Sequence, residues 1–428
     1  MESLATKPAM AETAGLEAFS KATCRFCGSN LKHTFVDLGM SPLCESYLSM
    51  DQLNQMEPFY PLYVYVCDQC YLVQLEEYVT PEHIFTEYAY FSSYATSWLE
   101  HVKKYTHQMI DRFKLDKNSF VVEVASNDGY LLQYVQQAGI PCYGIEPTAG
   151  TAAAARTKGL EIVERFFGAA LAGELAGQGR QVDLVAANNV LAHVPDINDF
   201  AAGFTRLLKP TGVATFEFPH LMRMVAENQF DTAYHEHYSY LSLGAVQRVF
   251  ASVGLQVFDV EELSTHGGSL RVFAQRADAA RRACGERVDA LLQAERAAGM
   301  DGSAFYGGFQ TAAERVKNEF LHFLVGAWRD GRRVAAYGAA AKGNTLLNFA
   351  GVRADLLSFV VDRNPAKQGR WLPGSRIPVV DESHLDASQP DYVVILPWNL
   401  RDEIAAQLQR VRGWGGRFVT AVPTLQVW

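Results

Sequence analysis

The pattern of hydrophobic and polar positions divides the chain into three parts. From residue 24 to about 78, short apolar runs such as 62–66 alternate with Cys, Gly and Pro, which predicts a small strand-rich unit. After a helical stretch, buried strands predicted at 120–124, 142–146, 182–187 and 212–218 alternate with helical patterns. This alternation indicates a parallel, doubly wound α/β sheet. A third unit repeats the order from residue 333, with further strands predicted at 358–362 and 392–396.

These patterns also predict the domain boundaries. The third unit has the strand, Gly-containing turn and helix that are typical of a Rossmann-like fold. The stretch before it is rich in Ala, Arg and Leu at helical spacing, which indicates a connector of one or two helices. We expect a disordered tail over 1–21, a small domain over 22–80, a central α/β domain over 81–280, a helical connector over 281–330 and a Rossmann-like domain over 331–428.

The composition is that of a globular protein, and the net charge disfavours some classes of binding partner. Of the 428 residues, 49% are hydrophobic and 20% are charged, so sizeable cores are expected. The 47 acidic and 38 basic side chains give a net charge of -9, which disfavours binding to nucleic acid or to an anionic membrane surface. The sequence shows no transmembrane run and no signal peptide, and an odd count of seven cysteines argues against a disulfide framework. We therefore expect a cytoplasmic protein. Its oligomeric state stays open, and a monomer is compatible with three domains in mutual contact.

The spacing of four cysteines predicts a structural zinc site. They form two C-x-x-C pairs, Cys24 with Cys27 and Cys67 with Cys70. Each pair supplies two thiolates from one tight turn, and zinc prefers four such ligands in a tetrahedron. Four thiolates leave no position for a reacting water, so the ion would not take part in catalysis. Four buried thiols or a redox pair are the alternatives, and between the pairs His33 and Cys44 are competing ligands.

A polar turn after the predicted strand at 120–124 has the features of a nucleoside site. Gly129 lets the backbone approach a ligand, and Glu146 ends the next strand, where an acid can bind both ribose hydroxyls. The turn has one glycine rather than the three of a dinucleotide site, which favours a single nucleoside such as S-adenosylmethionine. The candidate cofactor contacts are Glu123, Ser126, Asn127, Asp128, Gly129, Glu146, Asn188 and Asn189.

The loop over 187–196 follows the third predicted strand, at the carboxyl end of the sheet, where open α/β sheets bind their ligands. This loop supplies Asn188, Asn189 and His193. Such turns are also common as connections between strands and helices that bind no ligand. Together with the acidic residues and the glycine of the preceding turn, the loop favours a class I methyltransferase domain.

Residues 231–240 hold the densest cluster of chemically active side chains in the chain. They include two His, one Glu and three Tyr. A neutral imidazole can remove a proton next to a carbonyl, and a Tyr hydroxyl can hydrogen-bond the oxyanion that develops. Glu236 can orient the imidazole or hold a substrate hydroxyl, and methylation of carbon needs such a base. A metal site at His235 and His237, or a structural core cluster, remains an alternative.

Two later segments are candidates for substrate binding. The turn over 266–271 can close over a polar substrate, although a plain hairpin turn is equally consistent. The helix start over 337–344 offers backbone amides and Lys342 to an anion, which suits the pyrophosphate of a sugar nucleotide. Asp362 after the next strand raises an NAD alternative, but the spaced glycines of that site are absent. The candidate substrate contacts are His193, His266, Ser269, Arg271, Lys342 and Asn344.

These motifs occur in an order that resembles a known family. The Cys pairs, the E-x-x-S-N-D-G turn, the N-V-L-A-H-V-P-D loop, the Y-H-E-H cluster, the H-G-G-S-L-R turn and the G-A-A-A-K-G-N segment resemble nucleotide-sugar C-methyltransferases that act on 4-keto deoxyhexoses. The resemblance covers the chain from about residue 22 to its end. It implies a zinc domain, a central S-adenosylmethionine-binding domain and a carboxyl-terminal Rossmann-like domain that contacts the sugar nucleotide.

The resemblance also implies a reaction, namely methyl transfer to C3 of a dTDP-linked 4-keto-6-deoxy sugar in branched deoxysugar and antibiotic biosynthesis. In the family the final His of Y-H-E-H is the base and the Tyr assists, which corresponds here to His237 and Tyr234, with a contribution from Glu236. The ketone acidifies the C3 proton, the base removes it, and the enolate carbon attacks the methyl group. Two rival functions remain: an O- or N-methyltransferase of the same fold, and a non-enzymatic zinc-containing binding or scaffold protein.

Overall fold

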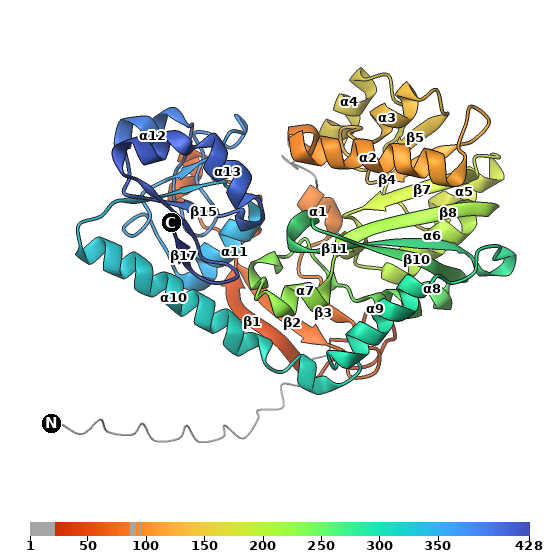
Figure 1. Ribbon diagram of the computed structural model, residues 1–428, viewed down its shortest axis with the longest axis horizontal. Coiled ribbons are helices and arrows are strands. Elements are labelled where there is room, and N and C mark those ends of the chain that lie inside the picture. The colour runs from red at the N-terminus through yellow and green to blue at the C-terminus, as the bar shows by residue number, and fades with distance from the viewer. Residues whose placement is uncertain (1–21, 86–90, 95) are drawn as a thin grey trace.

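The computed structural model describes residues 22–85, 91–94 and 96–428, so the predicted tail over 1–21 lies outside the described residues. Three sheets organise these residues into a small first unit, a central unit and a carboxyl-terminal unit. The central and carboxyl-terminal units stand apart at one end of the molecule, and the first unit lies where they approach each other (Figure 1). The long helix α10 (Phe309–Arg329) runs from there along the carboxyl-terminal unit. Among the described helices, none has the length and apolar character needed to cross a membrane.

The first sheet draws its last strand from the cluster at 231–240. It is antiparallel, in the order β1 (His33–Ser41), β2 (Tyr60–Val66), β3 (Val73–Leu75) and β9 (Ser239–Tyr240). In the β3–β9 pair, Val73 lies opposite Tyr240. The sheet therefore holds the segment that carries the predicted base against the first unit. A short helix, α1 (Pro81–Phe85), follows this unit.

The central sheet confirms the predicted α/β class. Its seven strands have the order β10-β11-β8-β7-β4-β5-β6, in which β4 to β8 are parallel and β11 runs antiparallel to its two neighbours. The strands are β4 (Val121–Val124), β5 (Cys142–Ile145), β6 (Ile162–Val163), β7 (Val182–Asn188), β8 (Leu208–Pro219), β10 (Leu255–Leu263) and β11 (Ser269–Arg276). The helices around it are α2 (Thr96–Phe113), α3 (Leu132–Gln137), α4 (Ala149–Thr157), α5 (Ala169–Gly177), α6 (Ile197–Leu207), α7 (Leu221–Ala226) and α8 (Leu243–Ser252).

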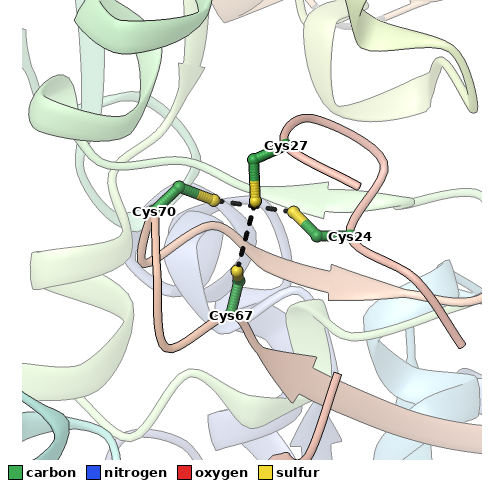
Figure 2. A group of neighbouring side chains, drawn as sticks. All are labelled: Cys24, Cys27, Cys67 and Cys70. Atoms are coloured by element: carbon green, nitrogen blue, oxygen red, sulfur yellow. Dashed lines mark hydrogen bonds between the residues drawn. The ribbon is translucent and has the colours of Figure 1, made fainter. Parts of the chain in front are cut away.

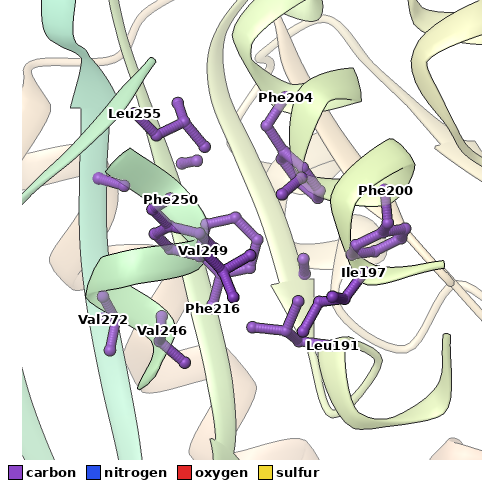
Figure 3. Packing of buried hydrophobic residues seen from close by; sticks show 14 of the residues in the cluster. Leu191, Ile197, Phe200, Phe204, Phe216, Val246, Val249, Phe250, Leu255 and Val272 are labelled. Carbon is purple, nitrogen blue, oxygen red and sulfur yellow. The ribbon is translucent and has the colours of Figure 1, made fainter. Parts of the chain in front are cut away.

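Aromatic packing on β8 fixes the loop before α6. Apolar residues of α6 and α8 meet on the sheet, with Phe216 of β8 between them (Figure 3). The ring centroid of Phe216 lies 4.6 Å from that of Phe204 and 4.6 Å from that of Phe250. The side chain of Asp196 caps α6 by accepting hydrogen bonds from the backbone N–H groups of Asn198 and Asp199. Because the cap and the apolar stripe fix where α6 begins, the loop over 187–196 is held at the carboxyl end of the sheet.

The carboxyl-terminal unit is Rossmann-like, as predicted. Its sheet has the order β14-β13-β12-β15-β16-β17, in which only β17 is antiparallel among the described strands. The strands are β12 (Val334–Tyr337), β13 (Val360–Val361), β14 (Val379–Val380), β15 (Tyr392–Ile395), β16 (Arg417–Thr420) and β17 (Gln426–Val427). Its helices are α11 (Ala341–Ala350), α12 (Ser383–Ser388) and α13 (Arg401–Gln407).

Helices α9 (Glu286–Ala297) and α10 form the predicted connector. Residues of α10 share one hydrophobic core with the first sheet and with the carboxyl-terminal unit. Within this core Phe309 stacks on Phe35 of β1 at a centroid distance of 4.6 Å. The first and last units are therefore joined by packing rather than by a loose linker, and both can contribute side chains to one site.

Candidate active site and zinc site

The four predicted cysteines come together. Their sulfur atoms point toward one another (Figure 2) and all lie within 4.8 Å of each other. The Sγ atoms of Cys24 and Cys70 are 3.5 Å apart, and those of Cys27 and Cys67 are 3.6 Å apart. A tetrahedral zinc ion with Zn–S bonds of about 2.3 Å places its sulfur ligands about 3.8 Å apart, so the cluster fits zinc.

The two competing ligands lie elsewhere. His33 pairs with Asp68 at 3.6 Å, and the Cys44 sulfur is buried 3.8 Å from the Thr345 hydroxyl. The hydrogen bond from Cys70 lowers the pKa of the Cys24 thiol, which favours the thiolate that zinc binds.

The two loops that carry the cysteine pairs pack on the central unit, next to the loop over 187–196. The Arg25 guanidinium donates to the Pro195 carbonyl at 2.5 Å, and the Asn198 amide donates to the Phe26 carbonyl at 3.0 Å. From α8, Arg248 donates to the Cys70 carbonyl at 2.7 Å. The zinc site thus supports a wall of the candidate active site without itself facing it.

All three units line one cavity of about 750 Å³. The central unit contributes both the polar turn after β4 and the loop after β7, the first unit contributes Glu45, and the carboxyl-terminal unit contributes Lys342, Lys367 and Asn399. The predicted site residues that line the cavity are Asn127, Glu146, Asn188, Asn189, His193, Tyr234, Glu236, His237, His266 and Lys342. Those that do not are Glu123, Ser126, Asp128, Gly129, Ser269, Arg271 and Asn344.

Glu146 is braced at one end of this cavity. Its Oε2 accepts a hydrogen bond from the Asn127 backbone N–H at 2.9 Å, and its Oε1 accepts one from the Thr148 backbone N–H at 2.9 Å. Burial raises the pKa of Glu146, and these two backbone bonds work against that rise. Each oxygen has a second lone pair, so the fixed carboxylate can accept the two hydroxyls of a ribose.

Four of the predicted cofactor residues shape the turn instead of facing the cavity. Gly129 has a φ of +76°, and a Cβ there would lie 2.3 Å from Leu160, which explains the glycine. Asp128 pairs with Lys158 at 3.4 Å. Glu123 is fully buried, and burial raises its pKa well above the ordinary value. Ser126 is fully buried as well. Periodicity located the turn correctly but could not tell which of its side chains point outward.

The geometry separates the two histidines of the 231–240 cluster. His237 Nδ1 lies 2.8 Å from the Thr232 carbonyl, which can only accept, so Nδ1 carries the proton and Nε2 keeps its lone pair. Burial and the neighbouring His193 lower the pKa of His237 well below 6.5. His235 instead contacts the Pro61 carbonyl at 3.2 Å and the Tyr60 ring, so it joins the cluster to the first unit.

Two side chains flank the His237 ring. The Tyr234 ring lies 3.9 Å from it, centroid to centroid, and the His193 ring meets it edge to face at 4.6 Å. Burial raises the pKa of the Tyr234 hydroxyl well above its ordinary value, so this hydroxyl stays a hydrogen-bond donor. A base with a free lone pair and a donor hydroxyl thus stand together at the cavity wall.

The turn at 265–268 joins the central and carboxyl-terminal walls. It is the hairpin connection between β10 and β11, and His266 in it has a φ of +56°. The His266 carbonyl accepts from the Lys342 ammonium at 3.2 Å, and a Cβ at Gly267 would lie 2.4 Å from Trp398. The Trp398 indole N–H donates to Asp231 at 2.8 Å. The turn is thus a hairpin connection that also joins the two units, and His266 within it lines the cavity.

Three predicted substrate contacts are used inside the protein. Ser269 donates to the Thr265 carbonyl at 2.9 Å, and Asn344 donates to the Cys44 carbonyl at 2.6 Å. Arg271 donates to Glu217 at 2.7 Å through Nε and to Glu261 at 2.9 Å through Nη1. Each of these side chains donates to another residue of the protein, which a linear motif does not reveal.

The sequence reasoning also missed several residues that line the cavity. They come from segments without a recognised motif: Glu45, Trp98, His101, Tyr130, Thr148, Phe166, Lys367 and Asn399. Trp98 and His101 are three residues apart in α2, so the spacing of an aromatic and an imidazole on one helix face was a usable signal.

Family descriptions agree with this architecture. Three consecutive stretches match family descriptions: a zinc binding domain over 24–85, a methyltransferase domain over 98–260 and a C-methyltransferase C-terminal domain over 264–423. Magnesium protoporphyrin IX methyltransferase from Synechocystis PCC 6803 aligns with 42% of this chain and 79% of its own at 16% identity and a TM-score of 0.33. An S-adenosylmethionine-dependent methyltransferase from Clostridium acetobutylicum ATCC 824 aligns with 42% and 92% at 11% identity and a TM-score of 0.34.

The central sheet and the four-cysteine cluster define a class I, S-adenosylmethionine-dependent methyltransferase with an amino-terminal zinc site. The C-methyltransferase NovU from Streptomyces niveus is 35% identical over 404 residues, which cover 94% of this chain and 96% of NovU. The chain therefore belongs to the family of S-adenosylmethionine-dependent C-methyltransferases.

Proposed function

We propose that this C-methyltransferase transfers a methyl group from S-adenosylmethionine to C3 of a nucleotide-linked 4-keto-6-deoxy sugar, with dTDP as the expected nucleotide. The observation that carries the proposal is a neutral His237 with a bare Nε2 in a cavity shared by the cofactor turn and by Lys342. Methylation of carbon needs a base for a C–H proton, and a cationic wall is what a sugar pyrophosphate needs.

His237 is the proposed base. The 4-keto group acidifies the C3 proton, and His237 Nε2 takes it, which leaves an enolate with its negative charge on the C4 oxygen. The Tyr234 hydroxyl donates a hydrogen bond to that oxygen. The enolate carbon then forms a bond to the methyl group as the carbon–sulfur bond breaks, and neutral S-adenosylhomocysteine leaves. General-base help of this kind typically contributes roughly 10²–10⁴-fold in rate.

Glu236 and His193 are proposed to hold the sugar. Both line the cavity beside His237, and His193 contacts the His237 ring. Burial lowers the pKa of His193 to about 4, so it is neutral and can share a hydrogen bond with a sugar hydroxyl without adding charge. Positioning matters because a well-oriented reacting pair can gain roughly 7–11 kcal/mol over free encounter in model systems.

Lys342 is proposed to face the pyrophosphate, because the other cavity lysine, Lys367, already has Glu45 and the Ala339 carbonyl as partners. Lys342 begins α11, where backbone N–H groups also favour an anion, and its ammonium lies 4.5 Å from the centre of the Trp398 ring. Lys367 pairs with Glu45 at 3.3 Å. The choice of dTDP comes from the resemblance of the motifs to nucleotide-sugar C-methyltransferases.

The test combines the purified protein with S-adenosylmethionine and a panel of dTDP-4-keto-6-deoxy sugars. Mass spectrometry detects one added methyl group, and NMR locates it. A methyl on C3 supports the proposal. A methyl on C5, the other carbon next to the ketone, would keep the enolate chemistry and correct the position. A methyl on oxygen would rule out the enolate, and no product despite cofactor binding would point to another nucleotide or acceptor.

A further inference from the structure

One imidazole of the cavity wall has no role in the proposed chemistry. His101, on α2, lines the cavity next to Trp98, and the two rings stack at a centroid distance of 4.9 Å and an angle of 16°. His101 Nε2 lies 2.8 Å from Oε2 of the buried Glu217. The ring is therefore held between an indole face and a carboxylate, which fixes its orientation before any ligand binds.

The position of this ring across the sheet is informative. Neighbouring strands follow the order β8-β7-β4-β5. Glu146 comes directly after β5 and Asn127 follows β4, whereas Asn188 ends β7 and Glu217 lies on β8. A ligand with its ribose at Glu146 that crosses the ends of β4 and β7 extends toward β8, where Glu217 contacts His101. In S-adenosylmethionine the end opposite the adenosine is the α-amino acid group, which carries a carboxylate.

The charges around Glu217 leave one ring nitrogen available. Oε1 of Glu217 accepts from Arg271 at 2.7 Å, and Oε2 has His101 as its partner. Burial works to raise the pKa of Glu217, but the hydrogen bond with His101 and the charge of Arg271 outweigh it, so the pKa lies below its ordinary value. Arg271 Nη2 also lies 3.4 Å from His101 Nε2, but the contact with the carboxylate is much shorter, at 2.8 Å. A carboxylate only accepts, so His101 Nε2 donates to it, and Nδ1 remains for a ligand.

We propose that His101 binds the carboxylate of the methionine end of S-adenosylmethionine through Nδ1. An imidazolium donates from both nitrogens, so the ring would link Glu217 to the ligand carboxylate by two charge-assisted hydrogen bonds. Trp98 and Glu217 act as positioning residues for this contact. The inference concerns the cofactor of the family and does not depend on which sugar is methylated or on His237.

The test compares two ligands that differ only in this carboxylate, S-adenosylmethionine and decarboxylated S-adenosylmethionine. Calorimetric titration of the full-length, zinc-loaded protein without sugar avoids turnover. In His101→Gln the amide can still donate to Glu217 but offers nothing at Nδ1. The expected result is a loss of S-adenosylmethionine affinity of roughly ten- to a hundredfold, the range of a charged hydrogen bond, with little change for the decarboxylated ligand.

Two controls decide between binding and folding. His107→Gln changes an exposed histidine of the same helix and should leave both affinities unchanged. In the wild-type protein, NMR of ¹⁵N-labelled histidine should show the His101 Nδ1 signal moving toward the imidazolium range with S-adenosylmethionine and not with the decarboxylated ligand. An equal loss for both ligands in His101→Gln, no loss for either, or an unmoved Nδ1 signal would overturn the proposal.

Discussion

Two strand–turn–helix units built on the same plan contribute to the cavity, and they present different groups to it. In the central unit β4 leads through a turn toward α3, and an acid, Glu146, follows β5. In the carboxyl-terminal unit β12 leads through a turn into α11, and Asp362 follows β13. Both acids accept hydrogen bonds from the backbone of their own unit: Glu146 from Asn127, and Asp362 from Ala339 at 2.7 Å. In both units, therefore, an acid after the second strand stabilises the turn that follows the first strand.

The two units differ in what faces the cavity. Glu146 lines it, whereas Asp362 does not. The Ala339 carbonyl of the second turn accepts from the Tyr47 hydroxyl at 2.6 Å and from Lys367 at 2.8 Å, so the first unit closes over that turn. At this second turn, the groups left for a ligand are the backbone N–H groups at the start of α11 and the ammonium of Lys342. The same plan thus offers a carboxylate for a nucleoside in one unit and a cation for an anion in the other.

The largest expected effect follows from removing zinc, because the first unit closes over the second turn and also supports the loop over 187–196 of the central unit. Structural zinc in small finger peptides contributes roughly 10–16 kcal/mol of apparent binding free energy, so a strong chelator should unfold the first unit. We expect the binding of dTDP-sugar to be lost while S-adenosylmethionine still binds, as measured by calorimetry with metal analysis. An intact fold in a protein shown to lack zinc would contradict the four-cysteine assignment.

The next largest effect concerns the base that stands between the two turns. His237→Asn should lower kcat by roughly 10²–10⁴-fold, because the base is lost and both ligand sites remain. Exchange of the C3 proton with deuterated solvent, followed by NMR in the presence of S-adenosylhomocysteine, should disappear as well. His235→Asn, two residues away, is the matched control and should retain exchange. Retained exchange in His237→Asn would assign the proton transfer to another group.

Much of this arrangement could be predicted from the sequence. The apolar runs located the central strands, and the C-x-x-C spacing located a cluster whose sulfurs do converge. Both signals are local, because one period or one short turn creates them. The pairing of β9 with β3 was not predictable, since it joins residues 239–240 to residues 73–74 through tertiary contact alone.

Side-chain orientation within a motif was the other limit. Arg271 and Asn344 stand in polar motifs, but Arg271 donates to the buried Glu217 and Asn344 donates to the Cys44 carbonyl. Conversely, the helical spacing of Trp98 and His101 places both on one face of α2 but does not show that this face meets the cavity. Lys367, in the carboxyl-terminal unit, carries no motif and lies at the cavity where that unit packs against Glu45 of the first unit. Hydrogen-bond partners far apart in the sequence decide which polar group is left for a ligand, and no spacing rule encodes them.

A pair of acid-to-amide changes tests the comparison directly. Glu146→Gln should weaken S-adenosylmethionine binding by roughly ten- to a hundredfold, because a charged acceptor of the ribose is lost. Asp362→Asn removes the same charge from the second turn and should leave that affinity unchanged, since Asp362 does not line the cavity. Calorimetric titration of both variants measures this. Equal losses would mean that the two acids act through stability alone.

A smaller effect is expected from the cation of the second turn. Lys342→Met should raise the KM for the sugar nucleotide by about tenfold, the size of one charged hydrogen bond, and should leave the S-adenosylmethionine affinity unchanged. Lys342→Arg keeps the charge and should recover part of the loss. Lys117→Met makes the same change at an exposed position and should have no effect. A KM that Lys342→Met leaves unaltered would place the pyrophosphate elsewhere.

The smallest expected effect is the response of kcat/KM to mild acid, and it tests the electrostatics between the two turns. A base with the ordinary pKa of 6.5 would be half protonated at pH 6.5, and kcat/KM, which reports the free enzyme, would fall to half. Burial lowers the pKa of His237 well below 6.5, so Nε2 stays free and kcat/KM should be nearly flat from pH 7.5 to 6.5. A half-maximal value near pH 6.5 would contradict this environment.

Unfolding must be separated from this titration as the pH falls further. Burial lowers the pKa of His193 and of His266 to about 4, so each of these histidines binds more protons in the unfolded chain than in the folded one between about pH 6.5 and 4. Each histidine therefore contributes a loss of stability of about 1.4 kcal/mol per pH unit as the pH falls through that window, whereas Asp231, whose pKa burial raises to about 6, contributes in the opposite sense. Thermal melts at each pH identify the range in which the protein is folded. Within that range, a loss of kcat/KM that begins only well below pH 6.5 is the titration of His237.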